Sequence, residues 1–130
     1  MKHVEVVCAI IKKDNQYFCC KRGPQMSLAG FWEFPGGKIE ENETQEEALI
    51  REIKEELDSK ISVIKYIGVS NHVYSDLPKP FSITMYAYLC ELVEGELVIS
   101  EHSESKWALL EEMHNMDFAA ADIPLIDLIK

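Results

Sequence analysis

Three glutamates, Glu52, Glu55 and Glu56, have the residue type and the spacing of a metal-binding group. They occupy positions i, i+3 and i+4 of a segment that we predict to be helical from about Thr44 to Leu57, so their side chains line one edge of that helix. Like charges at this spacing destabilise a helix by about 0.2–0.5 kcal/mol per pair. A hard divalent cation would cancel the repulsion, and oxygen ligands select Mg²⁺ or Mn²⁺. The spacing therefore favours metal-dependent phosphate chemistry.

The alternative interpretation of these glutamates is a solvated acidic face. They adjoin a predicted apolar stripe rather than lying opposite it, and that stripe comprises Leu49, Ile50, Ile53 and Leu57. Arg51 can pair with Glu47 and Glu55, one turn away on either side, whereas Glu52 has no oppositely charged residue within one turn. The position beside the stripe favours a binding site over a solvated face.

The residues before the helix would hold this edge in place. Thr44 and Glu47 have the spacing of a capping box, which fixes where the helix begins. Ahead of it, Gly36 and Gly37 permit a tight backbone turn, and Pro35 stiffens the approach. We therefore expect a rigid loop that faces the glutamates.

The rest of the chain alternates strands and turns around this one strong helix, which predicts a mixed α/β layer fold. Asp14 and Asn15 are typical of a hairpin turn between the first two strands. The predicted strands are 2–13, 16–22, a short extended piece at 31–34, 60–74 and 81–93, with shorter candidates at 95–100 and 105–110. Further helical segments are predicted at 111–116 and, as a closing helix, at 124–130.

The composition is that of an ordinary globular protein, with 47% hydrophobic and 28% charged residues in 130. This length suits a single domain spanning residues 1–130. The longest apolar run is 6–11, and the N-terminus has no signal-type sequence, so we expect no membrane segment and a cytoplasmic location. The cysteines lie in apolar runs without a CxxC pair, so buried reduced thiols are expected at Cys8, Cys19, Cys20 and Cys90.

The charge of the chain restricts its partners. A formal net charge of −10 opposes binding to polymeric nucleic acid, which needs a basic surface to neutralise phosphates. It does not oppose a small phosphorylated ligand that is carried in with a metal ion. Nine of the 23 acidic residues fall between Glu40 and Asp58, so the acidity is concentrated around the predicted site.

The acidic segment carries a specific motif: Gly, five residues, Glu, seven residues, then Arg-Glu-apolar-x-Glu-Glu. Its positions are Gly37, Glu43, Arg51, Glu52, Ile53, Glu55 and Glu56. This motif resembles the signature of the Nudix family. Four further features extend the resemblance to the MutT branch. They are Lys21-Arg22, the run FWEFPGG at 31–37, Glu101 six residues before Trp107, and FAAADIPLI at 118–126. It implies the Nudix fold, a mixed β-sheet sandwiched between helices with a loop-helix-loop. It also implies hydrolysis of nucleoside triphosphates to the monophosphate and pyrophosphate.

The resemblance implies the ligands of the catalytic cation, Mg²⁺ with Mn²⁺ as a substitute. Glu52, Glu55 and Glu56 would bind it, and the carbonyl of Gly36 and the carboxylate of Glu101 would complete its coordination. Glu52 would orient or deprotonate the attacking water, a role that Glu101 could share.

Other residues are expected to support catalysis or to bind the substrate. Arg51 would hold the helix and the loop by charge-assisted hydrogen bonds, and Glu43 would brace the loop. Arg22 and Lys38 are candidates to contact the triphosphate. The motif normally continues with a glycine where this chain has Asp58, so we expect a left-handed helix end that Asp tolerates, at some cost in stability.

Asp122 matches the position that reads the base in the MutT branch, although it could instead be a first-turn helix residue. As an ionised carboxylate it would only accept hydrogen bonds, which suits guanine, 8-oxoguanine and cytosine alike. Phe34, like Trp32 and Tyr86, could stack on the base, although aromatic residues in strands are more often core. The four histidines lack metal-ligand spacing and are interpreted as incidental, with His102 the only one near a proposed ligand.

Three functions are compared on this basis. The first is a metal-dependent nucleoside triphosphate pyrophosphohydrolase that removes 8-oxo-dGTP-type nucleotides from the pool. The second is the same chemistry on CTP or a modified dCTP. The third is a ligand-sensing Nudix module without catalysis, which the intact set of Glu52, Glu55 and Glu56 disfavours.

Overall fold

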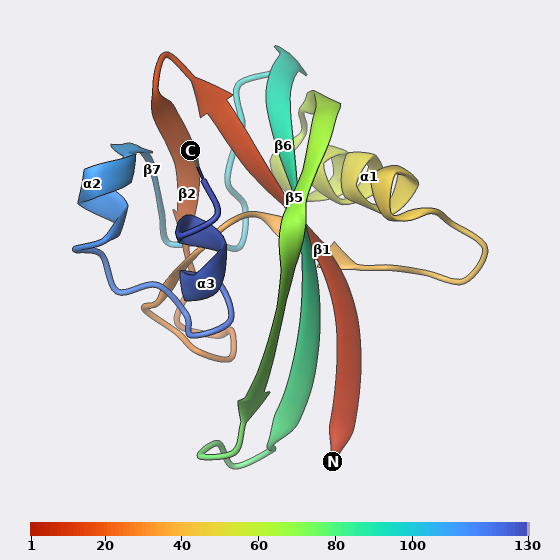
Figure 1. Cartoon of the computed structure of the whole chain (residues 1–130), viewed down its shortest axis with the longest axis vertical. Coiled ribbons are helices and arrows are strands. Elements are labelled where there is room, and N and C mark those ends of the chain that lie inside the picture. The colour runs from red at the N-terminus through yellow and green to blue at the C-terminus, as the bar shows by residue number, and fades with distance from the viewer. Residues whose placement is uncertain (130) are drawn as a thin grey trace.

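The computed structural model describes residues 1–129, and its centre is a seven-stranded mixed β-sheet (Figure 1). β1 runs parallel to β6, and the other strand pairs are antiparallel. The main strand order is β3-β2-β1-β6-β5, with β4 paired to β1 and β7 paired to β2. The strands are β1 (Lys2–Lys13), β2 (Gln16–Lys21), β3 (Trp32–Glu33), β4 (Gly36–Lys38), β5 (Lys60–Tyr74), β6 (Phe81–Glu94) and β7 (Glu104–Leu109).

Helices cover the sheet on two sides. α1 (Gln45–Leu57) lies on one side, and α2 (Leu110–Met113) and α3 (Ile123–Ile126) lie on the other (Figure 1). β1 divides its side chains between two cores, as the period of a strand requires: Val7 and Ala9 join the cluster that includes α1, whereas Cys8 and Ile10 join the cluster that includes α2 and α3. The predicted α/β sandwich is therefore confirmed.

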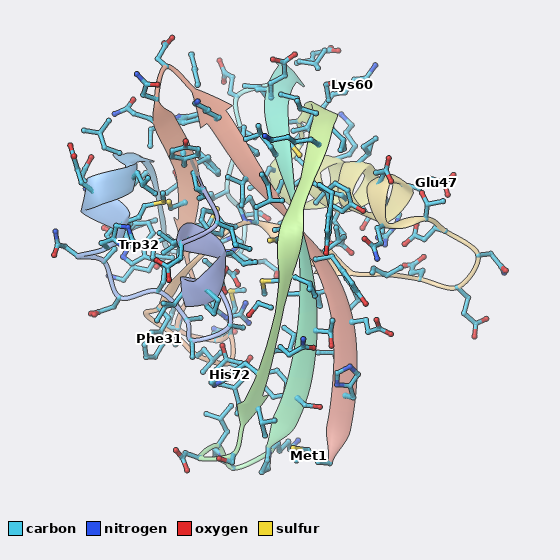
Figure 2. All side chains as sticks on the ribbon, viewed as in Figure 1. Met1, Phe31, Trp32, Glu47, Lys60 and His72 are labelled. Atoms are coloured by element: carbon cyan, nitrogen blue, oxygen red, sulfur yellow. The ribbon has the colours of Figure 1, made fainter. Side chains whose placement is uncertain are left out.

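The predicted start of α1 is also confirmed. The Thr44 hydroxyl accepts from the Glu47 amide at 3.1 Å, and the Glu47 carboxylate accepts from the Thr44 amide at 2.8 Å, which completes the capping box. Figure 2 shows Glu47 at the end of α1 that joins the acidic loop. The prediction that Ile50 packs on the sheet is wrong, because the buried stripe is rotated toward Ala48 and Ile50 is 41% exposed.

The predicted strand at 95–100 does not form. Its backbone instead completes the C-terminal end of α1: the Leu97 amide donates to the Ser59 hydroxyl at 2.8 Å, and the Val98 amide donates to the Leu57 carbonyl at 3.0 Å. Asp58 has the expected left-handed backbone, with φ of 47° and ψ of 44°. A helix end leaves carbonyls without partners, so this segment satisfies them rather than pairing with the sheet.

The shorter predicted elements are confirmed with different bounds. The hairpin turn has positive φ at both Asp14 and Asn15, which suits the twist of β1 and β2. The candidate strand at 105–110 is β7, and the helical turn predicted at 111–116 is α2. The predicted closing helix is reduced to α3, which ends at Ile126, and Lys130 lies outside the described residues.

The cysteines and the helices agree with two further expectations. All four cysteines are buried free thiols, and burial raises the pKa of Cys19 and of Cys90 to about 12, so they stay protonated. Within residues 1–129, none of the helices combines the length and the apolar character needed to cross a membrane.

Candidate active site

The two glycines ahead of α1 serve close approach rather than a tight turn. Gly36 and Gly37 lie in β4, opposite Cys8 and Val7 of β1, and neither has a left-handed φ. A Cβ atom on Gly36 would overlap the Val7 carbonyl oxygen, and one on Gly37 would overlap the carboxylate of Glu52. The predicted turn is therefore wrong, and the glycines instead let β4 pack against β1 and against the acidic edge of α1.

Arg51 connects the acidic residues of this region. Its Nη2 donates to Glu43 Oε1 at 2.6 Å, and its Nη1 donates to Glu52 Oε1 at 2.9 Å and to Glu55 Oε2 at 3.2 Å. The expectations that Glu52 has no charged partner and that Arg51 pairs with Glu47 are both wrong. The guanidinium extends toward β4, where it also donates to the Lys38 carbonyl at 3.1 Å.

The three predicted metal ligands on α1 differ in environment. Glu55 is exposed, whereas Glu52 and Glu56 are partly buried. Burial raises the pKa of Glu52, and the Arg51 hydrogen bond opposes that shift. Burial raises the pKa of Glu56 to about 7. The charge of His102 lowers this pKa, whereas nearby negative charges, including that of the exposed Glu101, raise it further. The cost of ionising Glu56 without a cation is thus the largest of the set.

The arrangement fits a divalent cation. Glu56 Oε1 is buried without a hydrogen-bond partner, and such an oxygen is costly to leave unpaired. The donors are carboxylate oxygens, which suit hard cations. In residues 1–129, no three acidic, His or Cys side chains already share a ligating geometry, and Arg51 pairs with both Glu52 and Glu55. Binding of a cation at this edge would therefore require a rearrangement of side chains.

A cavity of about 820 Å³ brings together three of the predicted substrate residues, Arg22, Lys38 and Asp122. This size is that of a small-molecule site. Phe34 does not line it: the Phe34 side chain is 2% exposed and packs on Phe118, with ring centroids 5.3 Å apart. The prediction that the Phe34 ring stacks on a base is therefore wrong, because the ring belongs to the core.

Asp122 is turned toward the sheet rather than toward its own helix. It makes no cap hydrogen bond to α3, and its Oδ2 accepts from the Phe34 amide at 3.0 Å. Burial, together with the negative charge of Glu33, raises the pKa of Asp122 well above its usual value, against the opposing effects of the Phe34 amide and Arg22. The Asp122 carboxylate is therefore harder to ionise in the folded protein than a solvent-exposed aspartate.

Sequence reasoning missed several residues of this region. Tyr74 and Phe81 line the cavity from the ends of β5 and β6, with ring centroids 5.1 Å apart. Their only signal was their position on either side of the proline-rich turn at 75–80. Glu33 and His102 were also missed as a pair: His102 Nε2 lies 2.8 Å from Glu33 Oε2, so the histidine is not incidental. The FWEFPGG run pointed to the neighbourhood of Glu33 without giving it a role.

Comparison with known proteins agrees with this geometry. A family model described as a NUDIX domain matches residues 6–128. The chain is 37% identical over 127 residues to the CTP pyrophosphohydrolase of Escherichia coli (strain K12), which covers 98% of this chain and 91% of that protein. It is 31% identical over 131 residues to the 8-oxo-dGTP diphosphatase of the same strain, which covers 100% and 98%.

A solved structure extends the comparison to three dimensions. The solution structure of the E. coli ORF135 protein superposes with a TM-score of 0.80 at 35% identity, covering 98% of this chain and 89% of that chain. The family model and these relatives span nearly the whole chain. The chain therefore belongs to the Nudix family of hydrolases.

Proposed function

We propose that this protein is a nucleoside triphosphate pyrophosphohydrolase that uses a divalent cation, with Mg²⁺ preferred and Mn²⁺ as a substitute. The observation that carries the proposal is the buried, unpaired oxygen of Glu56, at an acidic edge close to a cavity that contains Arg22 and Lys38. An acidic edge can bind a cation, and a basic cavity wall can bind phosphates. The names of the two E. coli relatives support the same reaction class.

The residues can be given roles in this reaction. Glu52, Glu55 and Glu56, with the Gly36 carbonyl and Glu101, would hold the cation, which would neutralise phosphate charge and polarise the phosphoryl group. Arg22 and Lys38 bind the triphosphate by charge and orient it.

Water is oriented and deprotonated by Glu52 or by Glu101, and it attacks the β-phosphorus. The bond that breaks joins the β-phosphorus to the oxygen that bridges the α- and β-phosphorus. The monophosphate leaves with that bridging oxygen, and pyrophosphate carries the oxygen of water. Arg51 holds the Glu52 carboxylate and the loop residue Glu43 in fixed positions relative to each other. Positioning and charge neutralisation supply most of the catalysis, as is usual for phosphoryl transfer.

We further propose that Asp122 binds the base as the neutral acid, which its burial favours, and that this restricts which bases can bind. A neutral acid donates one hydrogen bond and accepts others. 8-Oxoguanine presents an N7–H donor beside its O6 acceptor, and cytosine presents an amino donor beside its N3 acceptor, so each matches the neutral acid. Unmodified guanine presents two acceptors at N7 and O6, so it lacks this pairing on that edge and can match the neutral acid only through N1–H and O6. We therefore propose 8-oxo-dGTP-type nucleotides as substrates, with CTP or a modified dCTP as the second candidate.

A panel of normal and oxidised nucleoside triphosphates, with detection of pyrophosphate, tests this function. We expect 8-oxo-dGTP or a cytosine nucleotide to give the highest kcat/KM and dGTP to give a much lower one. Asp122→Asn should keep that preference, because an amide also offers one donor and one acceptor, whereas Asp122→Ala should lose about tenfold or more. Phosphate release without pyrophosphate, or a loss in Asp122→Asn equal to that in Asp122→Ala, would contradict the proposal.

We also propose which kind of ligand the enzyme binds and in which compartment it works. The net charge of −10 and the size of the cavity support a small nucleotide rather than polymeric nucleic acid as the ligand. Four buried free thiols support a reducing compartment, and hence the cytoplasm.

A further inference from the structure

Four side chains form a chain of contacts from the cavity to the acidic edge of α1. Arg22 Nη1 lies 2.8 Å from Glu33 Oε1, and Glu33 Oε2 lies 2.8 Å from His102 Nε2. On the other side of the ring, His102 Nδ1 lies 4.0 Å from Glu56 Oε1. The residues come from the end of β2, from β3, from the segment before β7 and from α1. Only the tertiary structure brings them together.

The hydrogen bond to Glu33 fixes the histidine ring. The side chain of His102 is 1% exposed, so water does not compete for it. An ionised carboxylate only accepts hydrogen bonds, so we assign the proton that faces Glu33 to Nε2. With Nε2 held by Glu33, Nδ1 must face Glu56.

The contact between His102 and Glu56 is incomplete. A distance of 4.0 Å is too long for a hydrogen bond. Both His102 Nδ1 and Glu56 Oε1 are buried, and within the described part of the chain neither has a hydrogen-bond partner. Two unpaired polar atoms that face each other are costly in a folded protein. Packing alone gives no reason to keep them, whereas a ligand held by Glu56 does.

We propose that His102 is a positioning residue for Glu56. Clamped by Glu33, its ring limits how far the Glu56 carboxylate can turn, and so directs Glu56 Oε1 toward the cation. Because Glu33 also holds Arg22, the same chain sets the cation site relative to the phosphate-binding wall of the cavity. This inference rests on the proposed function, since it assumes that Glu56 binds the cation. Residues that orient metal ligands typically change metal affinity or activity by about 10–100-fold when replaced.

Two substitutions of His102 distinguish the role of Nε2, which faces Glu33, from that of Nδ1, which faces Glu56. His102→Gln places an amide near the position of Nε2, so it can keep the bond to Glu33 while losing the group that faces Glu56. His102→Asn places its amide near the position of Nδ1 and no longer reaches Glu33. His114→Gln is the matched control, because His114 is exposed and lies outside the site.

The decisive measurement is the Kd for Mn²⁺ without nucleotide, from the electron paramagnetic resonance of free Mn²⁺, alongside Tm, kcat and KM. We expect the Kd to rise about tenfold or more in both His102 variants, with a matching loss of kcat and little change in KM. His114→Gln should behave like the parent. A folded His102→Gln with the parent's Kd, even with a lower Tm, would show a purely structural role and overturn the proposal.

A further variant covers the case in which His102→Gln does not fold. Glu33→Gln keeps the shape of the Glu33 side chain but removes its negative charge, and it should also raise the Kd for Mn²⁺. An unchanged Kd overturns the proposal. If the parent hydrolyses a nucleoside triphosphate and binds Mn²⁺ but the variants bind it equally well, only this inference fails. If the parent does neither, the proposed function fails and this inference fails with it.

Discussion

Arg51 and Glu43 form a bidentate ion pair, with Nη2 2.6 Å from Oε1 and Nε 3.1 Å from Oε2. Because Glu43 precedes α1 and Arg51 lies at the middle of the helix, the pair fastens the acidic loop along the helix. The same guanidinium holds Glu52, so the position of that carboxylate depends on the loop. The planar fork of arginine, which a lysine ammonium cannot reproduce, carries this connection.

Arg51→Lys should therefore lower both stability and turnover although it conserves charge. We expect kcat to fall about tenfold or more, because Glu52 loses a partner that orients it, and Tm to fall as the loop is released. Steady-state kinetics and thermal unfolding measure the two effects. Lys54→Arg is the control on the same helix, since Lys54 is exposed; an equal loss in that variant would contradict the role of Arg51.

Glu52→Gln should abolish most turnover without unfolding the protein. An amide cannot accept a proton from water and is a weaker cation ligand, so we expect kcat to fall by at least about a hundredfold. Circular dichroism and Tm check the fold. Glu46→Gln, at an exposed position of the first turn, makes the same chemical change and should be silent. Near-normal hydrolysis by Glu52→Gln would refute the catalytic assignment of Glu52, whereas a parent protein that hydrolyses no nucleotide would favour a sensing module.

Asp122→Asn should stabilise the protein increasingly as pH rises. The pKa of Asp122 is raised by burial in the folded protein, while the unfolded chain has a value of about 3.9. The contribution of a neutral Asp122 to stability is therefore complete below the unfolded pKa and is lost as pH rises through the folded pKa. Asparagine does not ionise and can still accept from the Phe34 amide, so its advantage should grow by up to about 1.4 kcal/mol per pH unit between the two pKa values.

Urea unfolding at a series of pH values from about 5 to about 8 measures this difference. Asp127→Asn makes the same change of charge five residues further on, at an exposed position, and should show no such trend. A constant difference between Asp122→Asn and the parent across this range would show that Asp122 is ionised in the folded protein. The complementarity argued for the base would then be lost.

Asp58→Gly should raise Tm slightly and leave turnover unchanged. Asp58 has a left-handed backbone at the C-terminal end of α1, where glycine has no Cβ penalty and no unfavourable charge at the negative end of the helix dipole. The substitution removes the exposed ion pair to Lys54 at 3.1 Å, but such pairs contribute little. A variant no more stable than the parent in a thermal melt would show that this ion pair outweighs the backbone strain.

What the sequence could predict about this protein was local. The capping box at Thr44, the helix that follows it and the placement of Glu52, Glu55 and Glu56 on one edge depend on neighbours within a few positions. The hairpin at Asp14 and Asn15 and the long strands depend on the period of the side chains in the same way. These features could be predicted because helix and strand geometry repeats along the chain.

What required the tertiary structure was every feature that joins distant segments. Phe34 and Asp122 are 88 positions apart, so neither the burial of the ring nor the raised pKa of the acid could be predicted from neighbouring residues. Glu33 and His102 are 69 positions apart, and their contact with Glu56 exists only because β3, the segment before β7 and α1 converge. The close approach of Gly36 to β1 and of Gly37 to Glu52 could not be predicted for the same reason. Burial and electrostatic environment are properties of the packed molecule, so the sequence determined which groups could do the chemistry, and the fold decided their pKa shifts and their partners.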